Sequence, residues 1–513
     1  MNSTKLLKPD DKDTMLAPCT STCPAGINVP EYIRCVVQGQ YDSARAVIAE
    51  KVPFPHSLGY VCFRPCESVC KRREIDDSIA ICNIKRFAAD NANENAMLRE
   101  RMAFKKIAKN NATGKRVIII GAGPAGLTAA YFLGLKGHSV TIFDKEAEPG
   151  GMMRYAIPEY RLPKSVLEED LTYIWQLGVK FRGNQRVNMK NLIGKYDALL
   201  IASGNPLPRK LRIGGMELSG VLWGLDFLRS IRKGDKVELK GKVLVIGGGH
   251  AAVNVALNAK RLGASEVSMV CLEKPEEMPA HKWEIDQAIE EGIQVHTSWG
   301  PRIVKGDNDP EGTNIPGDSG YTLTGKKIVR GASGKVKGVE FIRCVSVFDA
   351  NEQFSPQYDD CEIRYFDADT VIFAIGQAPD ASFIDIEGIT TEKGFVAVDN
   401  NSMTSKSGVF ACSEAIKSLG SVIHAVSQGR KAAESIDKYL GGNGDIYFQL
   451  HEKKPSLTKI SGHEELVKEK RVPMRRLPLD QRNGFSVINL GYNKDEAHKE
   501  ASRCLQCDLK PTD

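Results

Sequence analysis

Short apolar runs and amphipathic stretches alternate along the chain in an order that predicts strands and helices. Val117 to Ile120 form a fully apolar run beside a glycine-rich stretch, which is typical of a buried strand in a parallel sheet. The segment 115–144 reads as strand, glycine turn, helix and strand, and the segment 242–273 repeats this order. The pattern therefore predicts an α/β protein with two domains of the same kind.

The region before the first of these units has a different pattern. Helical stretches cover residues 29–51 and 79–108, and no convincing strand is visible among them. Residues 301–370 hold short β-prone runs between Gly, Asp and Asn, which predict strands and hairpins that complete the second domain. After a glycine-rich break at 441–444, a polar arm leads to a short helical segment at 494–504.

These patterns divide the chain, and its 513 residues correspond to roughly three domains. The polar residues 110–114 mark the first boundary. The predicted parts are a helical domain over 1–112, a first nucleotide-binding domain over 113–240 and 370–445, a second over 241–369, and a C-terminal arm over 446–513.

Composition narrows the functional classes. The chain is 42% hydrophobic and 26% charged, with a formal net charge of +6, which suits a soluble globular protein. No apolar run approaches the roughly 18 residues of a membrane span. The most basic stretch, residues 453–476, lacks the aromatic interleaving that would favour nucleic acid binding. The N-terminal residues lack the apolar core of an export signal, so we expect a cytoplasmic protein whose thirteen cysteines are metal ligands or buried thiols.

Both strand–helix turns carry a glycine pattern that binds dinucleotides. In residues 121–126, Gly-Ala-Gly-Pro-Ala-Gly, the first glycine allows the tight turn and the second lets the backbone approach a pyrophosphate. The third glycine lets the helix pack closely on the sheet, and Asp144 at the end of the next strand can bind a ribose hydroxyl. Residues 247–252, Gly-Gly-Gly-His-Ala-Ala, form the second turn. The predicted nucleotide-binding residues are Gly121, Gly123, Gly126, Asp144, Gly247, Gly249 and Ala252.

Eight cysteines gather at the two ends of the chain. Six precede the first glycine turn, and a Cys-x-x-Cys lies close to the C-terminus. The eight are Cys19, Cys23, Cys62, Cys66, Cys70, Cys82, Cys504 and Cys507. The Cys-Pro pair at residues 23–24 is typical of iron–sulfur motifs, although eight cysteines could also form two structural zinc sites. Residues 150–163 contain no cysteine pair, which argues against disulfide-reductase chemistry.

Motifs outside the glycine turns carry a resemblance to a known family. Residues 148–163, 369–376 (Asp-Thr-Val-Ile-Phe-Ala-Ile-Gly) and 408–411 (Gly-Val-Phe-Ala) resemble flavoproteins with two interleaved dinucleotide-binding domains. More closely, the chain resembles the family of the glutamate synthase small subunit. Its relatives include the large subunit of the bifurcating ferredoxin:NADP transhydrogenase and the N-terminal half of dihydropyrimidine dehydrogenase. The resemblance covers nearly the whole chain and implies two interleaved Rossmann-like domains, for FAD and for NAD(P)H, behind a helical iron–sulfur domain.

The resemblance also implies roles for residues outside the glycine turns. Arg161 is expected near the isoalloxazine as a catalytic residue, with a plain salt bridge as the alternative. Glu414 stands where the family usually has a shorter acid that binds the ribityl chain. The additional cofactor-binding residues implied are Gly151, Met152, Arg161, Ala374, Gly376 and Glu414.

By the same resemblance the cysteines hold two [4Fe–4S] clusters, and the C-terminal arm must return to the N-terminal domain. One cluster would take Cys19, Cys70, Cys504 and Cys507, and the other Cys23, Cys62 and Cys66. In the family a Glu or Gln on the following helix can be the fourth ligand of the second cluster. The equivalent position here is Lys85, whose ammonium cannot bind iron. Cys82 lies one helical turn earlier on the same face, and we predict that it is the fourth ligand.

Two further positions bear on whether the protein binds NAD(H) or NADP(H). Family members that use NADPH usually carry two arginines after the second strand of this unit, and those positions here hold Leu272 and Glu273. A carboxylate can accept a hydrogen bond from a free 2′-hydroxyl but repels a 2′-phosphate. The sequence therefore predicts NAD(H) rather than NADP(H), with Lys274 as the alternative determinant.

The expected activity is hydride transfer between a nicotinamide and FAD, with single electrons passing through two clusters to or from a ferredoxin or a larger redox complex. Flavin-based bifurcation stays open. The alternatives are the electron-donating small subunit of glutamate synthase and, from a different class, a zinc-binding nucleotide scaffold.

Overall fold

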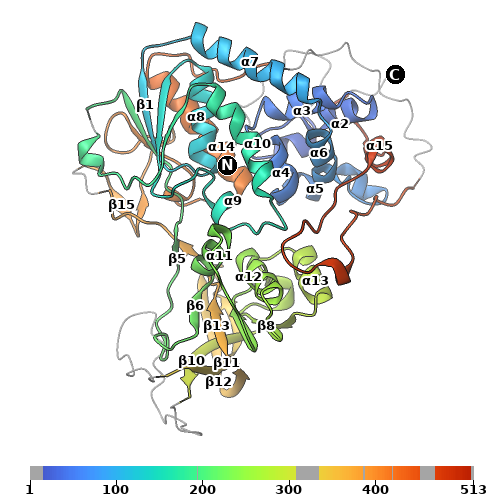
Figure 1. The fold of residues 1–513 in the computed structure, drawn as a ribbon, viewed down its shortest axis with the longest axis vertical. Coiled ribbons are helices and arrows are strands. Elements are labelled where there is room, and N and C mark those ends of the chain that lie inside the picture. Colours follow the sequence, from blue (N-terminus) through green and yellow to red (C-terminus); the bar gives the residue numbers. More distant parts are fainter. Residues whose placement is uncertain are drawn as a thin grey trace.

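The computed structural model describes residues 16–192, 194–307, 334–384, 388–418, 420–450 and 468–509. A helical domain packs beside a first parallel sheet, and a second sheet with its own helices lies below both (Figure 1). None of the helices among these residues is long and apolar enough to cross a membrane.

The N-terminal domain is a cluster of short helices, and no strand occurs among residues 16–112. Its helices are α1 (Pro18–Thr22), α2 (Val29–Val37), α3 (Tyr41–Ala49), α4 (Pro55–Val61), α5 (Pro65–Ser68), the 3-10 turn η1 (Lys71–Glu74), α6 (Ile81–Asp90) and α7 (Glu94–Asn110). Each long predicted helix is therefore two helices. Gly39, with φ +69°, breaks the first, because a left-handed residue cannot continue a helix. Asn93 starts the last helix by accepting hydrogen bonds from the Asn95 and Ala96 amides.

The first sheet is entirely parallel, in the order β17-β4-β1-β2-β3. Its strands are β1 (Arg116–Ile120), β2 (Ser139–Phe143), β3 (Lys180–Arg182), β4 (Ala198–Ile201) and β17 (Val409–Ala411). The accompanying helices are α8 (Pro124–Leu135), α9 (Met152–Tyr155), α10 (Lys164–Gln176) and α14 (Val422–Tyr439), with 3-10 turns η2 (Met189–Asn191) and η4 (Ser413–Ala415). Helix α8 is buried on all sides between the sheet and α14. Gly429 lets α14 approach the Ala125 carbonyl, which any side chain there would strike.

The second sheet is also parallel, in the order β6-β13-β7-β8-β9. Its strands are β6 (Val221–Trp223), β7 (Lys242–Ile246), β8 (Glu266–Val270), β9 (Gln294–His296) and β13 (Thr370–Phe373). Its helices are α11 (Gly224–Lys233), α12 (His250–Arg261), the 3-10 turn η3 (Pro275–Glu277) and α13 (Lys282–Glu290). Strand β6 and helix α11 precede residue 241, and β13 follows residue 369. The predicted boundaries therefore leave three elements of this domain with the first one, because a three-residue strand gives no periodic signal.

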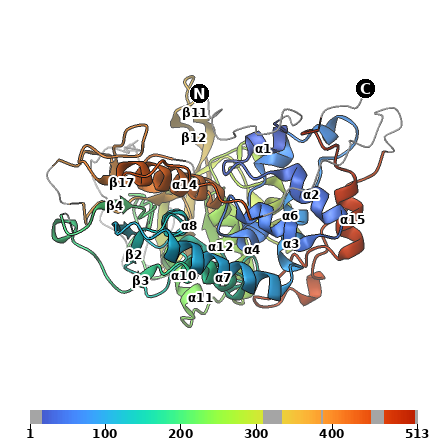
Figure 2. The same ribbon diagram turned by 90° about the horizontal axis from the view of Figure 1, so that it is seen from above.

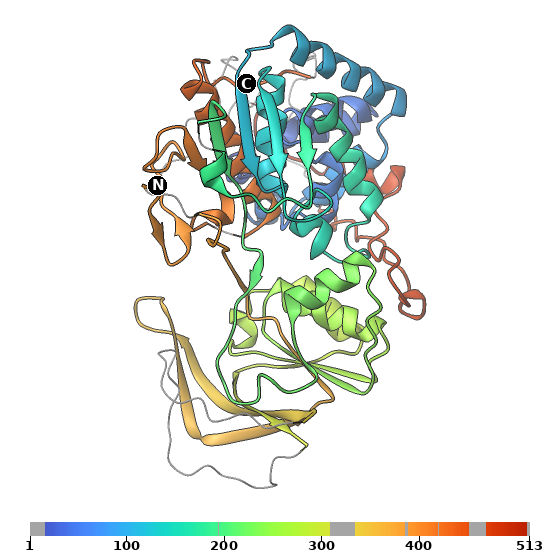
Figure 3. The same cartoon turned by 60° about the vertical axis from the view of Figure 1, so that its left-hand side comes forward.

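Shorter elements complete the fold. The strands β5 (Leu207–Pro208) and β14 (Gln377–Ala378) pair where the chain crosses between the two domains, and β15 (Thr391–Glu392) pairs with β16 (Phe395–Val396). An antiparallel sheet of β10 (Trp299–Gly306), β11 (Val336–Phe348) and β12 (Phe354–Asp367) reaches out from the second domain (Figure 3). Strands and hairpins are thus present where the sequence predicts them, except that residues 308–333 lie outside the described part.

The C-terminal arm returns to the helical domain. After the 3-10 turn η6 (Leu479–Gln481), helix α15 (Lys494–Ser502) packs against α2 and α6 (Figure 2). Glu500 on α15 is completely buried, and its carboxylate accepts hydrogen bonds from the Ala80 amide at 2.7 Å and the Val472 amide at 2.8 Å. Arg503 pairs with the same carboxylate at 2.7 Å. Residues 451–467 of the predicted basic arm lie outside the described part.

Because the Ala80 and Val472 amides would lose their acceptor, we expect Glu500→Ala to destabilise the N-terminal domain by about 2–6 kcal/mol, from about 1–3 kcal/mol for each buried donor left unsatisfied. Arg503 keeps a second carboxylate partner, Asp76, at 2.8 Å. Lys499→Ala, on the exposed face of the same helix, should stay within about 0.5 kcal/mol of the wild type. Denaturant unfolding of both variants measures the difference. Equal stability of the two variants would show that the arm is not held in this way.

Candidate nucleotide and iron–sulfur sites

The first glycine turn leaves open space where the sequence predicts a pyrophosphate. A Cβ at Gly121, whose φ is +108°, would strike the Ala202 carbonyl, and one at Gly126 would strike the Gly121 carbonyl. At Gly123, with φ −80°, the nearest atom to an added Cβ is the Gly151 Cα at 3.9 Å. Close packing therefore requires glycine at positions 121 and 126. Gly123 instead borders open space at the N-terminus of α8, where an anion such as a pyrophosphate is expected.

This contrast gives a prediction for Gly123→Ala. The fold tolerates a methyl group there, but the methyl group enters the space expected for the pyrophosphate. We expect a thermal stability close to that of the wild-type apoprotein and a 10- to 100-fold loss of FAD affinity, the equivalent of about 1–3 kcal/mol of overpacking. Flavin content after purification and a titration with free FAD measure the loss. If Gly123→Ala retained FAD fully, the pyrophosphate of FAD would not lie beside Gly123.

Other predicted flavin residues lie around the same turn. Asp144 follows β2 directly, and its carboxylate accepts hydrogen bonds from the Ala122 amide at 2.6 Å and the Glu146 amide at 2.8 Å. Burial raises the pKa of Asp144. A carboxylate has about four acceptor positions, so this one can brace the turn and still accept from a ribose. Gly151, just before Met152 at the start of α9, packs so closely on Gly123 that a side chain would collide with it.

Glu414 lies beyond β17, at the edge of the first sheet where the carboxyl ends of parallel strands meet. It accepts a hydrogen bond from the Ser413 hydroxyl at 2.5 Å. Ser413 has φ +61°, a left-handed conformation that favours glycine. Cys412 is completely buried.

The second glycine turn has the same construction. A Cβ at Gly247 would strike the Ala374 carbonyl, whereas a Cβ at Gly249 would meet no atom within 4 Å. Ala252 is buried in the first turn of α12. Ala374 thus packs against the second turn, and Gly376 follows it near the β14 crossing. The carboxylate of Glu273 lies beside this turn, because a Cβ at Gly248 would come within 2.8 Å of its Oε2. Burial raises the pKa of Glu273.

Arg161 connects the two nucleotide domains. Its guanidinium forms a salt bridge with Glu284 on α13 at 2.6 Å and donates to the Asn254 side chain on α12 at 3.1 Å. Glu284 also bonds the His250 ring. Burial raises the pKa of Glu284, but Arg161 and His250 outweigh it and hold the value at about 2. The salt bridge is therefore present, and the predicted contact of Arg161 with the flavin stays a prediction.

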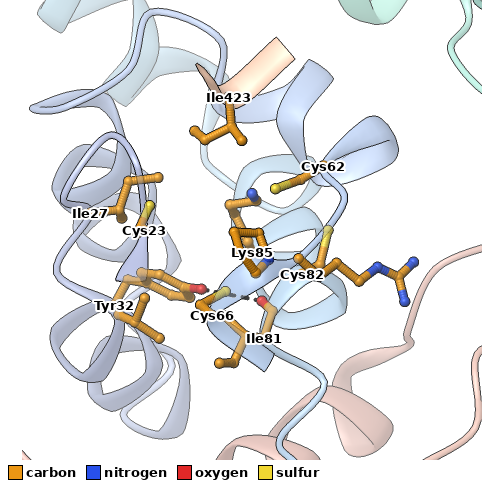
Figure 4. A pocket seen from close by; sticks show the side chains of 12 residues that line it. Cys23, Ile27, Tyr32, Cys62, Cys66, Ile81, Cys82, Lys85 and Ile423 are labelled. Carbon is orange, nitrogen blue, oxygen red and sulfur yellow. Dashed lines mark hydrogen bonds between the residues drawn. The ribbon is translucent and has the colours of Figure 1, made fainter. Parts of the chain in front are cut away.

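Four cysteines from separate elements line one pocket in the helical domain, called the inner pocket here (Figure 4). They are Cys23 after α1, Cys62 at the end of α4, Cys66 in α5 and Cys82 in α6. Ile423, from α14 of the flavin domain, lines the same pocket. All four cysteines are buried, so the pocket is sheltered from solvent.

The charges around the inner pocket suit an anionic group. Lys85 and Arg64 both line it. Burial lowers the pKa of Lys85, but the surrounding thiols outweigh this effect and raise it. The hydrogen bond between the Cys62 and Cys82 thiols lowers the pKa of Cys62 and raises that of Cys82. Sequence reasoning missed Arg64, although its position between Cys62 and Cys66, two predicted ligands, was a signal for it.

The other four cysteines line a second pocket, called the outer pocket here. They are Cys19, Cys70, Cys504 and Cys507, and all are partly exposed. Val29 and Ile81 line both pockets, so the two are adjacent. The docked C-terminal arm thus brings Cys504 and Cys507 beside Cys19 and Cys70. Burial and the neighbouring Cys70 and Cys507 raise the pKa of Cys19 to about 12.

Each pocket offers four thiols and no other typical metal ligand among its described lining residues. That donor set fits an iron–sulfur cluster, which is held by four cysteine thiolates. Within the described ranges, no group of three or more His, Cys, Asp or Glu side chains is arranged to hold a metal ion. The thiols are thus spread around each pocket rather than gathered at one point.

A stack of aromatic rings joins the inner pocket to both nucleotide domains. Phe63, next to Cys62, stacks on His424 of α14 with 5.4 Å between ring centroids. Its other neighbour is His281, just before α13, at 6.1 Å. The inner pocket therefore lies where all three domains meet. Nothing in the sequence around Phe63 signals this contact.

Comparisons with known proteins identify related domains in both parts of the chain. Residues 115–429 match the pyridine nucleotide-disulphide oxidoreductase family model, and residues 14–97 match the model of dihydropyrimidine dehydrogenase domain II, 4Fe-4S cluster. The chain is 34% identical to the beta subunit of the NADP(+)-dependent formate dehydrogenase of Moorella thermoacetica, over 97% of this chain and 71% of the relative.

Two further relatives have related names. The NADPH-Fe(3+) oxidoreductase subunit beta of Geobacter sulfurreducens (strain DL-1 / KN400) is 31% identical over 96% of this chain and 75% of its own length. The glutamate synthase [NADPH] small chain of Bacillus subtilis is 28% identical, over 83% of this chain and 86% of the relative. The solved structure of Mycobacterium tuberculosis FprA in complex with NADPH has a TM-score of 0.50 at 16% identity, covers 64% of this chain and 85% of its own, and shows the fold alone.

The iron–sulfur match favours clusters over the zinc alternative. The nucleotide-domain match supports FAD and NAD(P)H as cofactors. The chain therefore belongs to the glutamate synthase small-subunit-like family of NAD(P)H-dependent oxidoreductases, which join FAD- and NAD(P)H-binding domains to an N-terminal 4Fe–4S domain.

Proposed function

We propose that this chain is an NADH-linked electron-transfer subunit that exchanges electrons with a ferredoxin or with other subunits of a redox complex. Residues 121–126 hold FAD, and residues 247–252 with Glu273 hold NADH. The inner cysteines Cys23, Cys62, Cys66 and Cys82 hold one [4Fe–4S] cluster, and the outer cysteines Cys19, Cys70, Cys504 and Cys507 hold another. FAD, when bound, takes a hydride from the nicotinamide and releases electrons singly.

The order of the sites carries this proposal. Ile423 and His424 begin the flavin-domain helix α14, and they contact the inner pocket and Phe63 respectively. The inner pocket adjoins the outer pocket through Val29 and Ile81. The outer cysteines are partly exposed, whereas the inner ones are buried. This series leads from the flavin domain to the surface, as a conduit to a protein partner requires.

The choice of NADH rests on Glu273 beside the second turn. A carboxylate there accepts from a free 2′-hydroxyl and repels a 2′-phosphate. The names of several relatives specify NADP(H). The NADH preference is therefore proposed for this chain alone, on the basis of its own Glu273. A role as glutamate synthase small subunit is the second candidate, supported by 28% identity to such a chain. Bifurcation and the cytoplasmic location stay predictions from the sequence.

Anaerobic assays with Cys507→Ala test the conduit. The purified chain should reduce a ferredoxin with NADH. Cys507→Ala should reduce ferredoxin at least about tenfold more slowly because the exit site is lost, while NADH bleaches its FAD at the wild-type rate. Cys361→Ala, an exposed cysteine outside both pockets, is the matched control and should behave as wild type. Normal ferredoxin reduction by Cys507→Ala would remove the outer pocket from the path.

A further inference from the structure

Lys85 has an unusual place for a lysine. Its side chain is 5% exposed and extends from α6 into the inner pocket, among all four inner cysteines. Figure 4 shows it between Cys23 on one side and Cys62 and Cys82 on the other. A buried lysine normally has an anionic partner, because an isolated ammonium is costly to remove from water.

Among the described residues, no carboxylate forms a salt bridge with Lys85. Its side chain lines the inner pocket together with the four inner cysteines, whose thiolates are negatively charged when they bind a metal. The nearby Glu67 is already engaged, because it accepts from the Cys82 amide at 3.0 Å and pairs with Arg471 at 2.7 Å. Arg64, which is partly exposed, adds a second cation to the lining of the same pocket.

The outer pocket is arranged differently. Lys71 is largely exposed and pairs with Glu74 at 2.8 Å. Arg72 pairs with Asp76 at 2.5 Å. The cations that line the outer pocket are therefore neutralised by carboxylates, whereas Lys85 faces the inner cysteines directly.

A buried cation affects a cluster in a predictable way. Reduction by one electron adds one negative charge, and an ammonium in a medium of low dielectric attracts the reduced form more strongly than the oxidised form. The charge and hydrogen bonds around a cluster are among the factors that set its reduction potential. A fixed positive charge beside the ligands therefore raises that potential.

We propose that Lys85 is a redox-tuning residue, whose buried charge raises the reduction potential of the cluster held by the inner cysteines and leaves the outer cluster unaffected. The inference rests on the proposed ligand sets. In the resembled family, this position can hold a Glu or Gln that binds the cluster. Lys85 acts on the cluster through its charge instead.

The test is a redox titration of the holoprotein followed by electron paramagnetic resonance, with iron, sulfide and FAD measured first. We expect two one-electron waves. In Lys85→Met the midpoint potential of one wave should fall by about 59 mV. At the wild-type midpoint potential, the ratio of reduced to oxidised cluster is then about tenfold lower. Lys85→Arg should keep the wave near its wild-type position. Lys51→Met is the matched control, since Lys51 is 6% exposed in the same domain but stacks on Tyr447.

Each other outcome has a defined meaning. Unchanged waves in an iron-replete Lys85→Met protein would overturn the tuning role, and so would equal shifts in both waves. If Lys85→Met loses iron, Lys85→Leu supplies a second neutral side chain, and it cannot bind iron. Loss of one cluster in both neutral variants, with Lys85→Arg replete, would make the charge a requirement for assembly and overturn tuning. Absence of iron and sulfide from the wild type would instead refute the proposed function.

Discussion

Replacing Cys82 with alanine is expected to remove one cluster and leave the other intact. The wild-type chain should contain about eight irons, and Cys82→Ala about four, because a [4Fe–4S] cluster needs four ligands and, among the described residues, only the four inner cysteines offer thiols to the inner pocket. FAD content should not change, since Cys82 lies in α6 and not in a nucleotide domain. Iron and sulfide analysis of anaerobically purified protein measures the loss.

Cys35→Ala is the control for this experiment. Cys35 is 3% exposed in α2 of the same domain, yet it lines neither pocket. It should retain about eight irons. A full iron content in Cys82→Ala would refute Cys82 as the fourth ligand, and an equal loss in both variants would mean that any buried substitution disturbs the domain.

Replacing Glu273 with arginine is expected to reverse the nicotinamide preference. The wild type should favour NADH over NADPH, because the carboxylate beside Gly248 repels a 2′-phosphate. An arginine there would offer charge-assisted hydrogen bonds of about 1.5–3 kcal/mol to that phosphate. We therefore expect the ratio of kcat/KM for NADPH to that for NADH to rise about 10- to 100-fold.

The matched control is Glu276→Arg, which makes the same change of charge at an exposed position three residues along the chain. It should alter the ratio by less than about threefold, as expected of a screened surface charge. Steady-state rates with both nucleotides and an artificial acceptor measure the effect. A wild type that prefers NADPH, or two variants with the same ratio, would remove Glu273 as the determinant.

The glycine turns were predictable because their rule is local. Steric limits at Gly121 and open space at Gly123 follow from the backbone of one strand–helix turn, and the structure has that geometry. The break of the first long helix at Gly39 was not predicted, although glycine is unfavourable inside a helix and was a local signal for it. The domain boundary near residue 221 was not predicted either. Strand β6 has only three residues, and its place in the second sheet is evident only from its pairing with β13.

The rest of the site depends on contacts between distant parts of the chain. The family resemblance predicted that the C-terminal arm returns, but not that Glu500 fastens it to the Ala80 amide. The stack of Phe63 on His424 had no signal in the sequence. Such contacts arise when separate elements pack, and neither periodicity nor spacing encodes them.

The most direct test of the electron path is an anaerobic NADH titration of the purified chain, with visible and electron paramagnetic resonance spectra recorded at each step. The account predicts about eight irons with matching sulfide, bleaching of FAD, and the appearance of reduced-cluster signals on addition of NADH alone. Zinc without sulfide, or FAD that NADH bleaches without any cluster signal, would contradict it.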